Sequence, residues 1–265
     1  MMKDVEMSRI KMLILILILS ISFLITTKVD VKSNSEIIRV PEDYPVIQWA
    51  INAAEPGDTI LVSSGIYYER IVINKTLNLI GENKWTTILD GLNTGDVITV
   101  KANGVKISGF TIRKAGTHTD IYNCGIRLQA SHCIILNNLI RDAYTCISIA
   151  GDYNVIKQNI IKVSIWGGIG VEIEIGADNN ILLNNLVTGE ETAFSIGLDL
   201  TYCSKNKIVG NTISNHQWGI RYQASGNILF HNNFIGNIDQ VYDYSSGENN
   251  WDNGAEGNYW SDYRG

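Results

Sequence analysis

From residue 105 onward the chain repeats one arrangement of apolar and polar positions. Each unit has a starting residue, an aliphatic residue two positions later, an asparagine five later and an apolar residue seven later, as in Asn154, Ile156, Asn159 and Ile161. The first unit, from Val105, has Phe110 in place of the asparagine. The starting residues are Val105, Cys133, Asn154, Asn180, Asn206 and Asn227, with a mean spacing of about 24 residues. An internal period of this length is typical of solenoid proteins, in which each repeat packs against its neighbours.

The units are predicted to contain strands. Short runs of alternating or β-branched residues are separated by Asn and Gly, and no run keeps a helical period long enough for a helix. A leucine-rich repeat would need a run of spaced leucines, and a propeller would need units of about 40 residues. The pattern therefore predicts an all-β fold, a parallel β-helix solenoid with about 24 residues per coil.

The asparagines of the repeat are interpreted as structural. The chain contains 27 asparagines among 265 residues. Equivalent residues of successive coils lie about 4.8 Å apart and form ladders along the axis. One predicted ladder contains Asn138, Asn159, Asn185, Asn211 and Asn232. At a turn, Asn tolerates the left-handed conformation, and its amide can bond the amide of the next coil.

The amino end predicts export. Residues 12–27 are a run of 16 uncharged, mostly apolar residues, preceded by Lys3, Arg9 and Lys11. The run is short for a membrane-spanning helix, and its end lacks the small-residue cleavage pattern. We therefore expect residues 1–28 to be a signal peptide or an N-terminal membrane anchor. The body would then be secreted, periplasmic or at the cell surface, and in the anchored case would meet the membrane through this segment.

The rest of the chain divides by pattern into four parts. A short helix is expected within residues 45–54, where Pro45 suits the first turn and Ile47 and Ile51 share one apolar face. Such a helix can cover the open end of a solenoid. The expected parts are a tether at 29–36, an N-terminal cap and first coils at 37–103, the β-helix repeats at 104–250, and a C-terminal cap at 251–265.

Several short motifs carry a family resemblance. They are Ile47-Gln48-Xaa-Ala50-Ile51, Pro56-Gly57-Asp58-Thr59, Gly65-Xaa-Tyr67-Xaa-Glu69 and Leu79-Ile80-Gly81. These motifs resemble the opening of the pectin-lyase-like right-handed β-helix proteins. The Asn-rich coils and the ending Gly257 to Tyr263 resemble the NosD-type branch, which includes surface proteins and periplasmic copper-maturation factors. The resemblance covers about 220 residues and implies a single-stranded right-handed parallel β-helix.

The catalytic residues that the resemblance implies are missing. Pectin methylesterases in this superfamily carry Gln-Asp pairs, but no Gln of this chain is followed by Asp. Polygalacturonase-like Asn-Thr-Asp and Gly-Asp-Asp, and a pectate-lyase-like Trp-Xaa-Asp-His, are also absent. The sequence therefore contains no complete lyase, hydrolase or esterase signature.

A candidate site lies on the second strand of each coil. Apolar pairs such as Val171 and Ile173, or Leu198 and Leu200, are placed inward by strand alternation. The outward residues between the pairs are Arg127, Ser148, Glu172, Asp199 and Arg221. Glu172 and Asp199 would lie about 5 Å apart at the backbone, close enough for acid/base catalysis or for cation binding. A parallel outward column contains Glu174.

Aromatic residues precede these strands, roughly one per coil: Tyr122, Tyr144, Trp166, Phe194 and Trp218. An acidic pair beside aromatic rings is the chemistry of a sugar-binding face, so Arg127, Glu174, Arg221, Tyr144, Trp166 and Trp218 are candidate ligand-binding residues. His216 lies nearby as a candidate general base. The alternatives are a solvated charge ladder, aromatic rings that pack on one another, and an ordinary surface histidine.

No cofactor is evident from the sequence. All four methionines lie at or before residue 12, and the four histidines are scattered, which suits copper poorly. Calcium is conceivable at Asp252, Glu256 and Asp262, because hard cations take clustered carboxylates. The four cysteines have no zinc spacing; we interpret them as buried thiols, with a Cys124–Cys146 disulfide as the alternative.

Charge and pattern together define the expected function. The net charge is −6, and −8 without residues 1–28, which argues against nucleic acid as a partner. We expect an exported or surface-tethered monomer that binds polysaccharide or envelope glycans. One alternative is a carbohydrate-active enzyme, a polysaccharide lyase or glycoside hydrolase, that uses Glu172 and Asp199. Another is a NosD-like accessory factor for the assembly of a periplasmic copper enzyme.

Overall fold

The computed structural model describes residues 35–116, 123–190, 194–244 and 247–263. Residues 35–265 form one compact unit. The expected signal peptide or anchor, residues 1–28, lies outside the described residues, as does Tyr122. In the part of the chain that is described, no helix is both long and apolar enough to cross a membrane.

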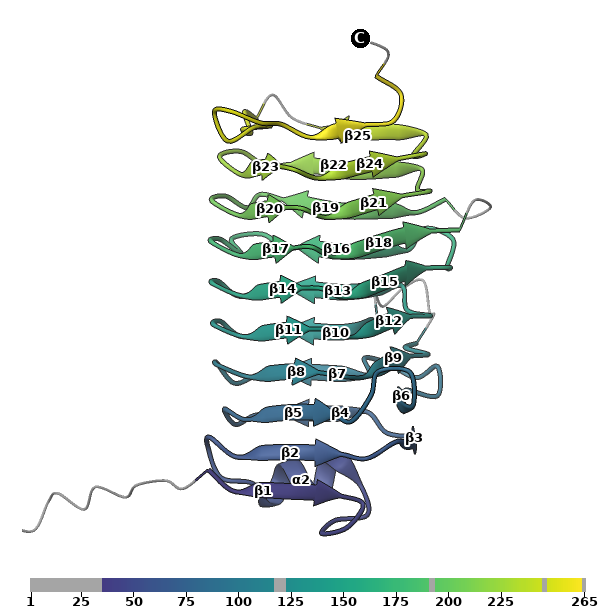
Figure 1. The fold of residues 1–265 in the computed structure, drawn as a ribbon, viewed down its shortest axis with the longest axis vertical. Helices are drawn as coiled ribbons and strands as arrows, with labels where there is room; N and C mark the ends of the chain where they lie inside the picture. Colours follow the sequence, from purple (N-terminus) through teal and green to yellow (C-terminus); the bar gives the residue numbers. More distant parts are fainter. Residues whose placement is uncertain (1–34, 117–122, 191–193, 245–246, 264–265) are drawn as a thin grey trace, which may run out of the picture. The chain divides into compact units, whose positions relative to one another are not determined.

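The unit is an all-β parallel solenoid of about nine turns, with about 23 residues per turn, as predicted (Figure 1). Its strands form three parallel sheets. Sheet A contains β1 (Ile37–Val40), β2 (Thr59–Val62), β5 (Asn78–Gly81), β8 (Lys106–Ser108), β11 (Ile134–Leu136), β14 (Val155–Lys157), β17 (Ile181–Leu183), β20 (Lys207–Val209) and β23 (Ile228–Phe230). Sheet B contains β3 (Gly65–Tyr67), β6 (Thr87–Asp90), β9 (Thr111–Arg113), β12 (Leu139–Arg141), β15 (Ile160–Val163), β18 (Leu186–Gly189), β21 (Thr212–Ser214), β24 (Asn233–Ile235) and β26 (Tyr259–Trp260). Sheet C contains β4 (Ile71–Ile73), β7 (Ile98–Val100), β10 (Cys124–Leu128), β13 (Thr145–Ile149), β16 (Ile169–Ile173), β19 (Ile196–Thr201), β22 (Trp218–Gln223) and β25 (Asp239–Asp243).

The core lies inside the coils and consists of stacked aliphatic columns. In sheet A, the aliphatic residue of the repeat pairs with its equivalent on the next coil, as Ile135 does with Ile156. Ile135, Ile156 and Ile208 are completely buried, and Leu182 is 1% exposed. Burial of such a side chain stabilises the fold by about 1.5–3 kcal/mol. Each coil buries its apolar face only by stacking on its neighbours, so the repeat period of the sequence becomes the turn of the solenoid.

The asparagine ladder forms, and it differs from the prediction in one respect. The left-handed backbone conformation belongs to the residue before each ladder asparagine, for example Asn137, Gln158 and Asn184. The ladder asparagines themselves point inward and are almost completely buried. Their amides bond the backbone of the preceding coil and donate to the asparagine Oδ1 of the next coil, so the structural interpretation is confirmed, while the left-handed geometry belongs to the residue before each of them.

Asn185 shows how one ladder residue is bonded. Its backbone N–H and its Nδ2 each donate to Oδ1 of Asn211 at 2.9 Å, and Nδ2 also donates to the Ile156 carbonyl at 2.8 Å. Its Oδ1 accepts from the backbone N–H and the Nδ2 of Asn159, both at 3.0 Å. The starting asparagines form a second ladder at another corner, where Asn206 bonds Asn227.

The predicted N-terminal helix is α2 (Ile47–Ala53), which packs against β1, β2 and β4. Ile47, Ala50 and Ile51 are its buried face. Glu69 caps its first turn from the next coil, because its carboxylate accepts from the N–H groups of Ile47 and Gln48 at 2.9 and 3.0 Å. A carboxylate at this end also suits the helix dipole.

The segment that the sequence separates as a C-terminal cap continues the last coil. β26 pairs with β24, and Asn258 extends the first asparagine ladder by accepting from Asn232. Trp260 stacks on Phe234 at 4.6 Å between ring centroids, and Trp251 lies against Trp260. These rings cover the apolar end of the core.

The four cysteines are buried and none is joined in a disulfide, so the alternative Cys124–Cys146 bridge is not formed. Cys124 lies opposite Thr145 in the pairing of β10 with β13, one residue out of register with Cys146. Burial raises the pKa of Cys146 to about 12, which keeps it protonated. This agrees with the interpretation of the cysteines as small core residues.

Removal of one whole coil should leave a folded, shorter protein. Deletion of residues 180–205 removes one strand from each sheet and places Asn206 where Asn180 bonds the N–H of Asn154. We expect the far-UV circular dichroism per residue to stay that of a β protein, because coils contact only their neighbours. Loss of the β signal, together with binding of a hydrophobic dye, would contradict the one-dimensional stacking.

Candidate functional site

Sheet C presents the outward column that the sequence predicts. Glu172 pairs in register with Ser148 on one side and with Asp199 on the other, and Asp199 pairs with Arg221. Val171 and Leu198 beside them are buried in the core. The alternation of the strands therefore places the charged residues on adjacent rungs outside the solenoid.

The two carboxylates of the column differ in environment. Asp199 is only 2% exposed and is held by the guanidinium of Arg221, whose Nε donates to its Oδ1 at 3.1 Å while Nη2 contacts Oδ2. The same guanidinium lies 5.6 Å from the Trp218 ring and 6.0 Å from the Tyr244 ring. The charge of the Asp199 carboxylate is therefore balanced by Arg221 and the carboxylate is buried, so Asp199 does not share an open site with Glu172.

Arg127 is also fully engaged, at the other end of the column. Its Nε and Nη2 contact the two carboxylate oxygens of Asp96 at 2.6 and 3.1 Å. Its Nη1 lies 3.9 Å from Oε1 of Glu174, which also accepts a hydrogen bond from Ser148. Sequence reasoning missed Asp96. It could have been found from the preceding coil, where Thr99 of β7 lies opposite Arg127 and Asp96 comes just before β7.

Glu172 has a half-buried carboxyl without a counter-ion. Within the described residues, no side chain forms a hydrogen bond or ion pair with it. Burial, and then the negative charges of Asp199 and Glu174, raise its pKa to about 7, although Arg127 and Arg221 act in the opposite direction. Both forms of this carboxyl are thus populated near neutral pH.

Glu172 opens into a groove of about 370 Å³. The groove is lined by Tyr144, Trp166, Gly167, Ile169, Glu172, Phe194, Ile196 and Arg221. Trp166 is 75% exposed, and its ring centroid lies 5.8 Å from that of Phe194. The aromatic residues come from the corners that enter β13, β16 and β19, so successive coils place them side by side. Ile169 and Ile196, which sequence reasoning missed, begin their strands at paired positions.

Trp218 lies outside the groove, contrary to its assignment as a ligand-binding residue. Its ring stacks on Tyr242 at 4.3 Å and meets Phe194 edge-on at 5.0 Å. The alternative that the aromatic rings pack on one another therefore holds for the C-terminal part of the row. Tyr144 and Trp166 form the part that lines the groove.

His216 is not the surface base that the sequence suggested. It is 2% exposed and lies in the corner before β22, where its Nδ1 is 2.9 Å from the hydroxyl of the buried Ser195. Its Nε2 has no hydrogen-bond partner among the described residues. Burial lowers its pKa to about 4, so the imidazole is neutral at physiological pH and reaches no solvent.

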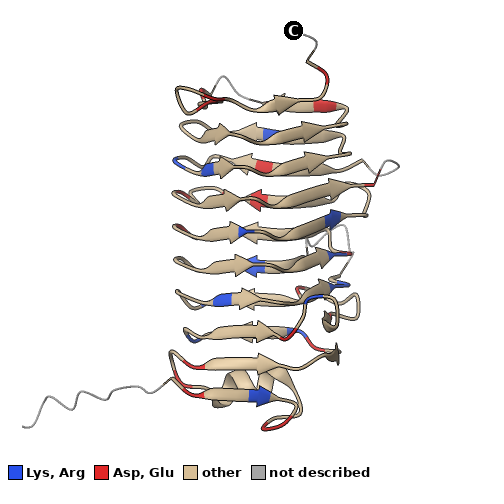
Figure 2. Cartoon of the chain, in the orientation of Figure 1, with Lys and Arg blue, Asp and Glu red and all other residues tan. Residues whose placement is uncertain are grey.

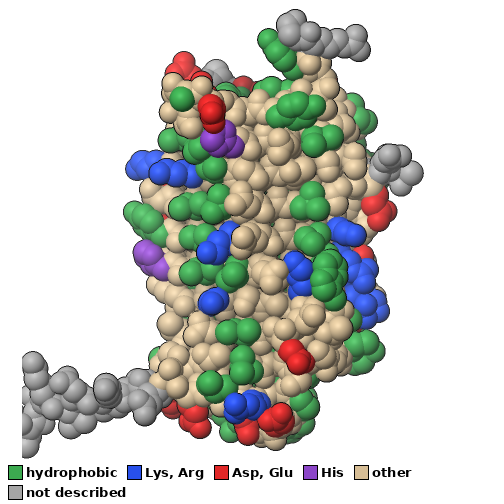
Figure 3. All heavy atoms as spheres, in the orientation of Figure 1, with side chains coloured by type: hydrophobic (Ala, Val, Ile, Leu, Met, Phe, Trp, Pro, Cys, Tyr) green, Lys and Arg blue, Asp and Glu red, His purple; other side chains and the backbone are tan. Residues whose placement is uncertain are grey.

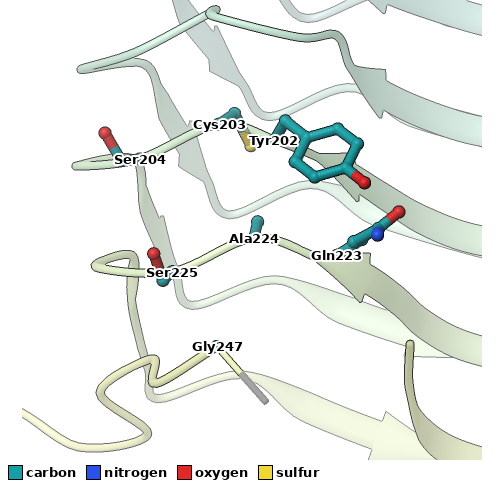
Figure 4. A pocket seen from close by; sticks show the side chains of 7 residues that line it. All are labelled: Tyr202, Cys203, Ser204, Gln223, Ala224, Ser225 and Gly247. Carbon is teal, nitrogen blue, oxygen red and sulfur yellow. The ribbon is translucent and has the colours of Figure 1, made fainter. Parts of the chain in front are cut away.

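A second hollow of about 410 Å³ lies at the corner that follows β19 and β22 (Figure 4). Tyr202 and Gln223 lie on one side of it, and Ser204 and Ser225 lie on the other (Figure 4). None of the described residues that line it carries a charged side chain. The groove at Glu172 therefore combines more of the features expected of a specific site.

The described residues bring no metal-binding set together. No group of three or more His, Cys, Asp or Glu side chains among them is arranged to hold a metal ion. His132 stacks on Tyr153 and His231 contacts Glu256, while the cysteines are buried singly. Calcium binding at Asp252, Glu256 and Asp262 gains no support from this arrangement.

Solved structures of similar fold include an alginate lyase and a pectin methylesterase. An alginate lyase from Paenibacillus superposes with a TM-score of 0.60 at 13% identity, covering 84% of this chain and 97% of the lyase. A pectin methylesterase from Aspergillus niger superposes with a TM-score of 0.54 at 11% identity, covering 84% and 87%. At these identities the similarity shows the shared right-handed β-helix fold alone.

Sequence comparison identifies a relative and a family. A cell surface glycoprotein of Methanothermus fervidus is 32% identical over 110 residues, which are 40% of this chain. The aligned part spans 17% of that relative's length. The family model described as periplasmic copper-binding protein (NosD) matches residues 51–265, most of the chain. The coils of this chain are joined by asparagine ladders, and its last coil contains Asn258, Tyr259 and Trp260. The chain belongs to the NosD family of right-handed β-helix proteins.

Proposed function

We propose that this protein binds a glycan in the groove of sheet C. The observation that carries the proposal is the unpaired Glu172 carboxyl beside the exposed ring of Trp166 in a groove of about 370 Å³. Sugar rings stack their apolar faces on aromatic side chains, and their hydroxyl groups donate to a carboxylate. Tyr144 and Phe194 extend the apolar wall across neighbouring coils.

Binding fits the geometry better than two-carboxylate catalysis does. Glycoside hydrolases place both carboxyl groups at the scissile bond. Here Asp199 is covered and held by Arg221, which leaves Glu172 alone in the groove. The one observation in favour of an enzyme is the pKa of Glu172, raised to about 7 by burial, which suits a general acid or base. Release of reducing ends or unsaturated uronates from the bound glycan would establish that alternative.

The family and the relative support the proposed location and partner. NosD is described as periplasmic, and the Methanothermus fervidus relative is a cell surface glycoprotein. Both support an exported or surface location, where envelope polysaccharide is the available partner. The copper named by the family description does not match the donors of the described residues, which gather no group of ligands. A role in the assembly of a copper enzyme would therefore act through protein contact.

Replacing Trp166 by alanine should weaken glycan binding at least tenfold without unfolding the protein. The ring is largely exposed, so its loss removes the stacking surface, worth about 0.5–1.5 kcal/mol beyond its area, at little cost to the core. A glycan array followed by calorimetric titration of the best ligand measures the effect. Trp85→Ala is the matched control, because Trp85 is 59% exposed at the corner before β6. Equal affinity of the Trp166 variant and the wild type would overturn the site.

A further inference from the structure

Among the described residues that line the groove, the one cation is Arg221, and it is paired with Asp199; Arg127 lies further along the column. Arg221 gives two of its nitrogens to Asp199, and Arg127 gives two to Asp96. Adding Glu172 and Glu174 leaves four carboxylates against two guanidiniums, a surplus of two negative charges when all are ionised. In Figure 2 the acidic positions of β16 and β19 lie on adjacent coils.

Sheet B carries further cations, of which Arg113 pairs with Asp90 and Arg141 pairs with Asp142. Arg113, Arg141 and Lys162 occupy paired outward positions on β9, β12 and β15. Figure 3 shows Lys and Arg side chains gathered along the right side of the molecule in this region. An acidic sugar would therefore meet repulsion at Glu172, and the groove is unsuited to the uronate polymers that are named for the structural neighbours.

The aromatic residues and the carboxylate that line the groove together suit a cationic ligand group. Three aromatic side chains, Tyr144, Trp166 and Phe194, line the same groove as Glu172, whose carboxylate has no counter-ion among the described residues. Aromatic faces carry negative electrostatic potential and attract ammonium groups within about 6 Å of the ring centroid. A carboxylate in the same groove completes the recognition of an organic cation, because the rings and the carboxylate attract the same charge.

We propose that the groove binds its ligand through a cationic ammonium group, as carried by an amino sugar whose amine is not acetylated. Glu172 is the counter-ion, and Tyr144, Trp166 and Phe194 are the surrounding rings. This inference rests on the proposed glycan binding and names the class of glycan. It also explains why Glu172 is left without a partner while each neighbouring acid has one: the ligand supplies the missing charge.

Calorimetric titration of the full chain with four probes at pH 7 tests the inference. The probes are the β-1,4-linked glucosamine tetramer, its N-acetylated counterpart, tetragalacturonate and choline. We expect the glucosamine tetramer to bind at least tenfold more tightly than the N-acetylated tetramer, choline to compete with it, and tetragalacturonate to bind most weakly. Glu172→Gln should abolish the preference for the amine. Glu42→Gln is the matched control, because Glu42 is exposed and makes only a 3.8 Å ion pair with Arg39.

The outcomes distinguish the failure of the ammonium inference from the failure of the glycan proposal. If the N-acetylated tetramer binds as tightly as the glucosamine tetramer, or tetragalacturonate binds more tightly, the ammonium inference is wrong and glycan binding stands. If choline binds in a Glu172-dependent way but no oligosaccharide binds, the glycan proposal is wrong and the ammonium inference stands. Absence of binding by all four probes overturns both. The melting temperature of each variant confirms that it is folded, and Trp166→Ala provides a second variant that should lose choline binding.

The pH dependence of choline binding gives an independent readout, because choline keeps its charge at every pH. With a pKa of about 7, Glu172 is mostly protonated at pH 6 and mostly ionised at pH 8, so choline affinity should rise by up to about tenfold over this range. The titratable and charged groups around Glu172 are Cys124 and Arg127 from β10, the Tyr144 phenol, Glu174, Asp199 from β19 and Arg221 from β22. Glu172→Gln should flatten the profile. A profile that keeps its slope in this variant would overturn the role of Glu172.

Discussion

Replacing Asn185 by alanine should cost about 3–5 kcal/mol of folding free energy, a large fraction of what a domain has in total. The side chain makes four hydrogen bonds, two as donor and two as acceptor, in an almost completely buried position. Alanine removes the acceptor of the Asn159 backbone N–H, and it leaves one of the two N–H donors of the Asn159 amide unpaired, since the other still donates to the Ile135 carbonyl. Each buried donor that loses its partner costs about 1–3 kcal/mol, which is why the effect exceeds the loss of four ordinary bonds.

The measurement is urea denaturation followed by circular dichroism, with Asn233→Thr as the control. Asn233 is a strand residue of the same chemistry, but its amide makes one long hydrogen bond, 3.4 Å to the Thr212 hydroxyl, near the surface. Its replacement should change stability by about 0.5 kcal/mol or less. An Asn185→Ala variant that unfolds at the same urea concentration as the control would show that the ladder is not what holds the coils.

The coil architecture could be predicted because parallel stacking repeats each environment. Ile135, Ile156 and Leu182 occupy one position of the turn, so the sequence shows the same residue type at each step. The asparagine ladder is visible for the same reason. The short strands β1 and β3 were not predicted, because each lies outside the repeat and depends for its pairing on one neighbour, β2 or β6.

The sequence predicts the strand positions of the site residues but not the contacts of their side chains. Alternation places Glu172 and Asp199 on neighbouring rungs of the outer face, and the structure agrees. Which acid stays free depends on which side chain the Arg221 guanidinium reaches, and that is a matter of side-chain rotamers across coils. The position of His216 was missed for a related reason. His216 stands where the next coil has Asn237, so the residue type is not repeated at this corner, and a single histidine does not distinguish a buried corner from the surface.

His216 occupies a ladder-like position, which makes its burial understandable. Its backbone N–H donates to Oδ1 of Asn237 on the next coil at 3.0 Å, just as the ladder asparagines bond to one another. Asn237 in turn donates from Nδ2 to the Ile213 carbonyl at 3.0 Å. A side-chain amide therefore fits this corner on the neighbouring coil, so His216→Asn should fold and replace the imidazole with the group that the ladder uses elsewhere.

The stability of the wild type should fall by about 3 kcal/mol more than that of His216→Asn as the pH drops from 7 to 4. The pKa of His216 is lowered by burial to about 4 in the folded protein, against about 6.5 in the unfolded chain. The unfolded state therefore binds the proton first, and stability is lost as the pH falls from 6.5 to 4 and changes no further through this group below that. Urea denaturation at pH 7, 5.5 and 4 measures the difference between the two proteins, which cancels the contribution of the carboxylates common to both.

His132→Asn is the control, because His132 is exposed and already has the left-handed backbone that asparagine tolerates. Because only one ring nitrogen of His216 has a partner in the described structure, the imidazolium would bury an unpaired N–H, and identical pH profiles for the wild type and His216→Asn would show that the corner admits water.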